Sequence, residues 1–284
     1  MKKLTVGMAT YDDFDGVFFS VQAIRMYHPE VMDQIEILVI DNNPDSPSGK
    51  AVKKYMEASV PNGRYIPFKK FKSNFVKERV FVEAEGEFVL CIDCHVLLPP
   101  GALRKLIAYY ELFPNTNDLI QGPMWHDNLK DCSTHFKPRW RGGMYGTWDT
   151  DQELLDRGDA FEIPMQGCGL LSCKKENWVG FNPDFRGFGG EEWYIQEKFR
   201  KYGGRALCLP FLKWNHRFGR PAGAPFKVNI EDKIRNYFLG WMELYNNIEH
   251  PGIQEMLDSF TESGHGEVVD KVVRSFFDSF QISK

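Results

Sequence analysis

The sequence predicts an α/β fold, in which a mostly parallel sheet is covered by helices. Across the first hundred residues, short β-rich runs alternate with helical patterns, an arrangement typical of parallel sheets. Several predicted strands end on polar residues, at the edge where open α/β sheets bind ligands. A chain of 284 residues can form one large domain with an appendage. We therefore expect a catalytic domain over residues 1–225 and a C-terminal helical extension over residues 226–284.

Four strands are expected in the first half of the chain, with a helix after each. The strand patterns are LTVGMAT (4–10), IEILVIDN (35–42), RYIPF (64–68) and EFVLCID (87–93). The helices are expected near residues 17–26, 49–58 and 75–85, with a fourth opening at Pro100, because proline is tolerated in a first helical turn.

The second half is less regular. Residues 115–159 show neither helical nor strand periodicity, and their aromatic residues argue against disorder, so we expect a long substrate-facing loop there. The strand patterns FEIPMQGCGLLSC (161–173) and RALCLPF (205–211) flank a helix that runs from the glycine-rich FRGFGGEEW (185–193) to Tyr202. Three amphipathic helices are expected over residues 229–246, 253–260 and 268–280. The last of them places on one face Val269, Val272, Val273, Phe276, Phe277 and Phe280.

Composition excludes several classes of protein. Hydrophobic residues make up 43% and charged residues 26%, which disfavours disordered, fibrous and membrane proteins. The net charge of -4 does not indicate a protein that binds nucleic acid through its overall charge. No apolar run is long enough for a membrane anchor, and six irregularly spaced cysteines favour reduced thiols, so we expect a cytoplasmic protein. Cys91 and Cys94 form a C-x-x-C, but a strand pattern and the lack of a second such pair favour burial over redox or zinc chemistry.

Polar residues at three predicted strand ends indicate a nucleotide site. Thr10 and Tyr11 follow the first strand, and Asp41 follows four apolar residues of the second. Asp41 can accept hydrogen bonds from a base or ribose, and Tyr11 can cover a base. Asp41 could alternatively cap the loop, but the common position of the three polar strand ends at one sheet edge favours the nucleotide interpretation.

The third strand end indicates a metal site. Asp93 and His95 form an Asp-x-His, and in extended backbone this spacing points both side chains the same way. His216, at the end of a later strand pattern, is the natural third ligand. A carboxylate with imidazoles suits Mn²⁺ better than Ca²⁺, although an isolated histidine is more often structural.

These motifs resemble a known family. The segments CIDCH, MQGCGLLSC, GFGGEEWYIQEKFRKYGG and WNHRF occur in the order seen in GT-A fold glycosyltransferases. They are most similar to the catalytic domain of the polypeptide N-acetylgalactosaminyltransferases, whose metal motif is Asp-x-His, and the likeness covers residues 3–220. It implies the GT-A fold, with a Rossmann-like mixed sheet flanked by helices.

The resemblance also implies roles for individual residues. Asp93, His95 and His216 would bind Mn²⁺ or Mg²⁺, and Asp41 would contact the uridine of a UDP-sugar donor. Lys77 and Arg79 would lie at the sugar or diphosphate. Glu191 and Glu192, after two glycines, match the stretch that reaches the sugar and acceptor, although acidic residues also favour helix N-termini electrostatically.

Trp140 and Arg141, followed by two glycines in the irregular segment, are expected to form a lid. Closure would bring an arginine to the diphosphate and a tryptophan over the sugar.

The sequence thus predicts a metal-dependent transfer of a sugar from a UDP-sugar to an acceptor hydroxyl, and the resemblance implies retention of configuration. Because no anchor, stem or lectin domain is recognisable, a compact bacterial or viral relative is expected, working in a bacterial cytoplasm or an infected host cell. Its acceptor would be a glycan, a protein or a modified nucleobase, and nucleic acid enters only as an acceptor. The alternatives are a nucleotidyltransferase or sugar-nucleotide pyrophosphorylase, disfavoured by the acidic MATYDDFDG, and a non-catalytic sugar-binding module.

Overall fold

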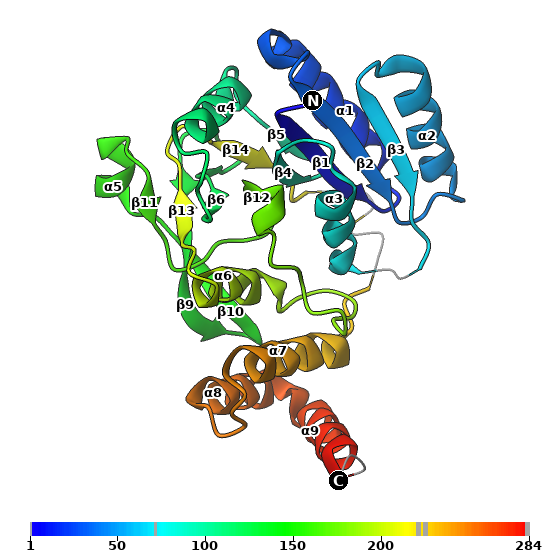
Figure 1. Ribbon diagram of the computed structural model, residues 1–284. Helices are drawn as coiled ribbons and strands as arrows, with labels where there is room; N and C mark the ends of the chain where they lie inside the picture. The colour runs from blue at the N-terminus through cyan, green and yellow to red at the C-terminus, as the bar shows by residue number, and fades with distance from the viewer. Residues whose placement is uncertain (1, 71–72, 220–222, 224–226, 282–284) are drawn as a thin grey trace.

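The structure, a computed structural model, describes residues 2–70, 73–219, 223 and 227–281, and it confirms the mixed α/β fold (Figure 1). Among these residues an eight-stranded sheet has the order β11-β13-β6-β12-β4-β1-β2-β3. Its strands are β1 (Leu4–Thr10), β2 (Ile35–Asp41), β3 (Gly63–Pro67), β4 (Phe88–Asp93), β6 (Leu119–Gln121), β11 (Phe161–Glu162), β12 (Leu170–Lys174) and β13 (Ala206–Cys208).

The sheet is parallel on one side and mixed on the other. Strands β4, β1, β2 and β3 are parallel, whereas β12 runs antiparallel to both β4 and β6. The continuous strand expected over residues 161–173 is wrong, because the chain forms β11 and β12 with a loop between them. Pro164 has no backbone donor, and Gly167 and Gly169 have no side chain to pack, so this stretch is poorly suited to a strand.

Helices cover both faces of the sheet (Figure 1). Those described are α1 (Phe14–Tyr27), α2 (Pro47–Ser59), α3 (Lys77–Glu83), α4 (Ala102–Leu112), α5 (Gln152–Arg157), α6 (Glu191–Lys201), α7 (Ile230–Tyr245), α8 (Pro251–Phe260) and α9 (Gly266–Gln281). Helix α1 begins where the Asp13 carboxylate accepts a hydrogen bond from the Gly16 amide at 2.9 Å. The Ser46 hydroxyl caps α2 in the same way, and Pro47 occupies its first turn.

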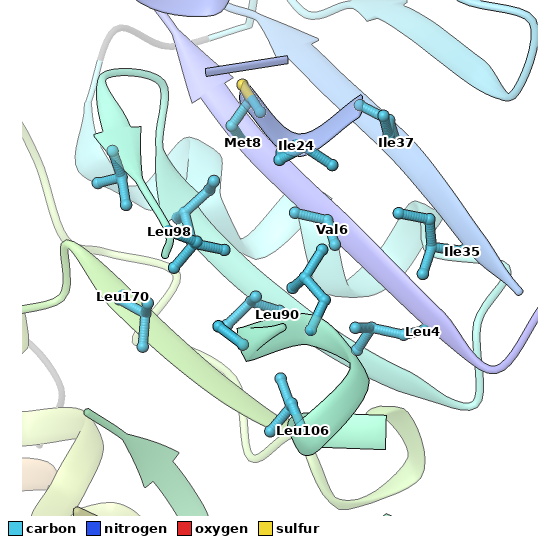
Figure 2. Close-up of a cluster of buried hydrophobic side chains, with 14 of the residues drawn as sticks. Leu4, Val6, Met8, Ile24, Ile35, Ile37, Leu90, Leu98, Leu106 and Leu170 are labelled. Carbon is cyan, nitrogen blue, oxygen red and sulfur yellow. The ribbon is translucent and has the colours of Figure 1, made fainter. Parts of the chain in front are cut away.

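The strands alternate their side chains between two hydrophobic cores. Leu4, Val6 and Met8 of β1 face one core, together with Ile35 and Ile37 of β2 (Figure 2). The opposite core takes the intervening residues of β2 and β4 and continues into α3, α6 and α7. Because both faces are covered, the strands are apolar almost throughout, as in parallel sheets generally.

Gly7 lets α3 lie directly on β1. A Cβ at this position would come within 2.3 Å of Val80 Cγ1, so any larger residue would push the helix away from the sheet. The first residue of α3 is Lys77, and the close approach therefore fixes where that lysine enters the site described below.

A second small sheet and a hairpin replace the expected irregular loop over residues 115–159. The small sheet has the order β5-β14-β7-β8, and strands β9 and β10 form the hairpin. These strands are β5 (Val96–Leu97), β7 (Met124–Trp125), β8 (Cys132–Ser133), β9 (His135–Arg141), β10 (Met144–Asp149) and β14 (Trp214–His216). The hairpin turn is Gly142–Gly143 with φ of 56° and 68°, the left-handed backbone that a two-residue turn of this kind requires. The two glycines that suggested a flexible lid therefore form a tight turn.

Helix α7 packs on α6 and α8 lies beside the hairpin strand β9, whereas α9 packs on α7 and α8 (Figure 1). The rings of Trp193 in α6 and Trp241 in α7 stack with centroids 4.3 Å apart, so the extension shares a hydrophobic core with the sheet. The expected boundary between residues 225 and 226 lies outside the described residues, as do the side chains of Phe277 and Phe280. In the described part of the chain, no helix has the length and apolar character needed to cross a membrane.

Candidate metal and nucleotide site

The strand register brings the expected ligands to one place. Thr10 lies opposite Asp41, and Ala9 lies opposite Asp93, so β1, β2 and β4 end at the same edge of the sheet. In the small sheet, β14 pairs antiparallel with β5, which follows directly after residue 95. The last residue of β14, His216, is therefore carried to the end of β4.

Asp93, His95 and His216 converge on one point. His216 Nε2 lies 3.2 Å from Asp93 Oδ2 and 3.2 Å from His95 Nε2, and one ligand atom of each residue lies within 4.8 Å of the others. Two adjacent ligands about 2.1 Å from an octahedral ion are separated by about 3 Å. The two separations from His216 therefore match those between adjacent ligands of one divalent cation, and the nitrogen and carboxylate donors suit Mn²⁺.

Lys77 binds the second carboxylate oxygen of Asp93. Its Nζ lies 2.8 Å from Asp93 Oδ1 and donates to the Cys168 carbonyl at 2.8 Å, and only 9% of the lysine side chain is exposed. Burial acts to lower the pKa of Lys77, but the Asp93 charge outweighs it and the pKa is raised. Burial acts to raise the pKa of Asp93, but Lys77 and the two histidines hold that pKa well below its usual range. The carboxylate is therefore ionised, with Oδ2 directed at the histidines.

Asp13 orients this centre, and the sequence analysis did not identify it. Its Oδ2 lies 2.9 Å from His95 Nδ1, and its Oδ1 accepts from Arg217 Nη2 and the Gly16 amide, both at 2.9 Å. When His95 Nδ1 donates to this carboxylate, Nε2 keeps its lone pair for a cation, an arrangement common around metal-binding histidines. Burial opposes ionisation, but the bonds from His95 and Gly16 and the charge of Arg217 hold the pKa of Asp13 well below its usual range.

Asp13 has two roles, because it caps α1 through the Gly16 amide and also contacts His95. The second role depends on β4 lying beside β1 and on the segment after β14 returning to this edge. A contact across 82 residues leaves no local signal in the sequence.

Thr10 and Asp41 lie along the same edge, on the side away from the small sheet. Thr10 Oγ1 is buried and has no hydrogen-bond partner in the described part of the protein. Asp41 is fully buried, and its carboxylate accepts from Tyr65 Oη and the Asn43 amide, each at 2.8 Å. Burial raises the pKa of Asp41 despite these two bonds. Tyr11 follows Thr10 directly and is half-buried.

The remaining expected residues lie at two helix starts. Glu191 and Glu192 open α6, and electrostatic interactions link Glu192 to Lys77 and to Lys233 of α7. Burial and the Glu191 charge raise the pKa of Glu192 to about 8. Arg79, in α3, pairs with Glu83 and lies over the Phe68 ring at 5.4 Å.

The hairpin residues are placed differently from the lid that the sequence predicted. Trp140 packs against Tyr145, Tyr237 and Phe260, with ring centroids 4.8 to 5.8 Å apart, so its ring belongs to the core shared with the extension. Arg141 is exposed beside the glycine turn. A lid movement would have to break the Trp140 contacts.

The two cysteines of the C-x-x-C are buried on opposite sides of the sheet. Cys91 belongs to one hydrophobic core and Cys94 to the other, and both are free thiols. A residue separation of three places strand side chains on opposite faces, which explains the arrangement.

Comparison with known proteins gives a family and a set of relatives. A model of glycosyl transferase family 2 matches residues 7–150. Polypeptide N-acetylgalactosaminyltransferase 10 of Mus musculus is 24% identical over 235 residues, covering 76% of this chain and 38% of that protein. The Homo sapiens protein of the same name is 23% identical over the same coverage. The chain thus spans less than half the length of these curated relatives.

Solved structures show the same fold at low sequence identity. A crystal structure of GalNAc-T7 with UDP, GalNAc and Mn²⁺ superposes with a TM-score of 0.67 and 11% identity, covering 98% of this chain and 58% of that one. The mannosyltransferase PcManGT from Pyrobaculum calidifontis, in complex with GDP-Man and Mn²⁺, gives 0.58 and 14%, covering 96% of this chain and 74% of that one. Residues 1–349 of S. aureus TarS with UDP-GlcNAc give 0.57 and 14%, covering 92% and 73%. The fold is that of GT-A glycosyltransferases.

Proposed function

The chain belongs to glycosyl transferase family 2, and from this we propose that it transfers a sugar from a UDP-sugar to an acceptor hydroxyl, using a divalent cation. The observation that carries the proposal is the convergence of Asp93, His95 and His216 at the sheet edge where Thr10 and Asp41 also lie. Relatives of the same fold contain UDP or GDP-sugars together with Mn²⁺, which supports a nucleotide-sugar donor.

Asp93, His95 and His216 would hold the cation, with Mn²⁺ preferred over Mg²⁺ because two of the three donors are imidazole nitrogens. A bound divalent cation supplies Lewis-acid stabilisation of the negative charge on the departing diphosphate. Lys77 keeps the Asp93 carboxylate ionised, and Asp13 keeps the lone pair of His95 Nε2 directed at the same point.

The nucleoside would lie along the ends of β1 and β2. The unpaired hydroxyl of Thr10 offers a donor and an acceptor to the nucleotide, and Asp41 would accept from the uracil or ribose. Tyr11 would cover the base, and Arg79 would approach the diphosphate.

The sugar would lie between the cation and the start of α6. Glu191 would accept hydrogen bonds from sugar or acceptor hydroxyls, while Glu192, protonated at neutral pH, can donate one. In the transfer, the bond from the anomeric carbon to the diphosphate oxygen breaks, a bond from that carbon to the acceptor oxygen forms, and the proton of the acceptor hydroxyl passes to the departing diphosphate. We propose that the acceptor attacks on the face that the diphosphate leaves, so that the configuration is retained.

The acceptor class proposed is a glycan, protein or modified nucleobase. We also propose a cytoplasmic site of action, because all six cysteines are free thiols and such thiols persist in reducing compartments.

The test is release of UDP from a panel of UDP-sugars by the purified protein. We expect slow, Mn²⁺-dependent hydrolysis without acceptor, its loss on chelation with EDTA, and its recovery when Mn²⁺ is restored. Asp93→Asn should abolish release without unfolding the protein, since the asparagine keeps the shape of the ligand but removes its charge. Asp33→Asn, in a turn outside the site, is the matched control.

Other outcomes identify the rival functions. Formation of pyrophosphate or transfer of the nucleotide would indicate a nucleotidyltransferase or pyrophosphorylase. Binding of UDP-sugar without any UDP release, with acceptors present or absent, would indicate a binding module. Activity that survives EDTA, or that Asp93→Asn leaves intact, would exclude the cation mechanism.

A further inference from the structure

A cavity lies between the β9–β10 hairpin, α6 and α7, which Figure 1 shows beside one another. Its volume is about 450 Å³, within the range of about 300–1,000 Å³ that small-molecule sites occupy. None of its lining residues belongs to the candidate metal and nucleotide site. The proposed function therefore does not account for it.

Aromatic rings form one wall of the cavity. Trp193 and Trp241 stack at 4.3 Å with an interplanar angle of 24°, and Tyr245 stacks on Trp241 at 5.2 Å and 27°. Tyr145 meets Trp193 edge-on at 6.2 Å. The two tryptophans are almost fully buried, whereas Tyr245 is 40% exposed and also stacks with His250 at 4.2 Å. The rings are held rigidly by one another, so a ligand that packs on them costs little side-chain entropy.

Fixed polar groups also line the cavity. Arg200 Nη2 donates to the Ile163 carbonyl at 2.7 Å, Nη1 pairs with Glu197 Oε1 at 2.5 Å, and Nε lies 3.8 Å from Glu162 Oε1. The guanidinium thus holds the carboxylate of Glu197 in place, close to the hydroxyl of Tyr245. Each carboxylate group keeps acceptor capacity beyond the bond to Arg200.

The charged groups that line the cavity favour some classes of ligand over others. The two carboxylates disfavour an anion. The guanidinium between them disfavours an organic cation, although an aromatic wall alone would attract one. A neutral polyol with an apolar C–H face suits both the rings and the carboxylates, because the face can pack on the rings and its hydroxyls can donate to the carboxylates.

We propose that this cavity binds one sugar residue of a carbohydrate acceptor, separate from the residue that receives the new sugar. The proposal rests on the proposed function and narrows its acceptor class to glycans. Helix α6 runs from the proposed position of the transferred sugar to the cavity, because Glu192 lies at its start and Glu197 lines the cavity. Five residues of α-helix span about 7.5 Å, a distance that a short oligosaccharide can bridge.

The experiment is saturation-transfer NMR on the full chain with a panel of hexoses, N-acetylhexosamines and their disaccharides, in the presence of Mg²⁺. Tyr245→Ala removes the exposed ring, and Glu197→Gln removes the carboxylate while keeping its size. Tyr27→Ala is the matched control, because Tyr27 is 45% exposed and, like Tyr245, is the last residue of its helix. We expect at least one saccharide to bind, with a dissociation constant at least tenfold higher in both cavity variants and unchanged in the control.

Two results would overturn the proposal: no saccharide of the panel binds the wild-type protein, or binding is the same in Tyr245→Ala as in Tyr27→Ala. Binding of choline in a manner that depends on Tyr245, without saccharide binding, would also overturn it. A parallel calorimetric titration with UDP and Mg²⁺ separates this failure from failure of the proposed function. Normal UDP binding without saccharide binding removes the cavity proposal alone. Saccharide binding that depends on Tyr245, without UDP binding, removes the nucleotide-sugar function instead.

Discussion

Replacing Asp13 by asparagine should weaken cation binding although no proposed metal ligand changes. The carboxylate holds two donors, Arg217 and the Gly16 amide, on Oδ1, and His95 Nδ1 on Oδ2. The amide oxygen of asparagine will face the two donors, which leaves the amide NH₂ facing His95. Two N–H donors cannot bond to each other, so His95 must move its proton to Nε2, the atom directed at the cation.

The expected loss of Mn²⁺ affinity is about 10- to 100-fold, or about 1.4–2.8 kcal/mol, the usual effect of removing a partner of a metal-binding histidine. Stability should fall by about 1 kcal/mol, because Arg217 keeps its hydrogen bond but exchanges a charged acceptor for a neutral one, whereas asparagine still caps α1. The pKa of Asp13 lies well below its usual range, so its carboxylate is ionised at neutral pH in the wild-type protein.

The assay is calorimetric titration of Mn²⁺ into the UDP-saturated protein, with Asp15→Asn as the control. Asp15 lies on the same turn of α1, and it is exposed. Nitrogen-15 spectra of the imidazole ring report the tautomer, which a purely structural role would leave unchanged. If Asp13→Asn binds Mn²⁺ within twofold of Asp15→Asn and keeps the wild-type tautomer, Asp13 does not orient His95.

Three further predictions follow from individual residues. Thr10→Val should lower UDP affinity about tenfold without loss of stability, because its buried hydroxyl has no partner among the described residues. Unchanged calorimetric affinity would remove Thr10 from the nucleotide site. Glu192 binds a proton in the folded protein up to about pH 8 but, at its ordinary pKa of 4.5, not in the unfolded chain. Its contribution to stability therefore falls as pH rises between these values. In urea unfolding, the stability of Glu192→Gln relative to wild type should increase from pH 5 to pH 8. An unchanged difference in stability over this pH range would contradict the raised pKa. Trp140→Ala should lower the free energy of unfolding by about 3 kcal/mol, measured by thermal unfolding. UDP with Mn²⁺ should not slow proteolysis of the wild-type hairpin, and protection by nucleotide would support the lid hypothesis instead.

The sequence predicts the regular half of this fold well. In β1, β2 and β4, apolar runs end on polar residues, and burial on both faces leaves little ambiguity about either the strands or their common edge. Asp93, His95 and His216 could be named together because an Asp-x-His follows a strand and the resemblance supplies the third residue. The structure brings them together, and their binding of a cation remains a prediction.

The second half resisted prediction for physical reasons. Strands β9 and β10 are half-exposed and rich in polar and aromatic residues, so they lack the apolar alternation that identifies a strand. The Gly142–Gly143 turn was the available signal, since two adjacent glycines between strand-forming residues favour a two-residue hairpin turn. The roles of Asp13 and of the aromatic cavity depend on contacts between distant segments, which no local pattern contains.

Crystals grown with Mn²⁺ and UDP offer the most direct test of the central claim. Anomalous diffraction should show one manganese ion within about 2.0–2.3 Å of Asp93 Oδ2, His95 Nε2 and His216 Nε2 and in contact with diphosphate oxygens. A manganese ion bound elsewhere, or UDP bound with no ion between these three residues, would contradict the account.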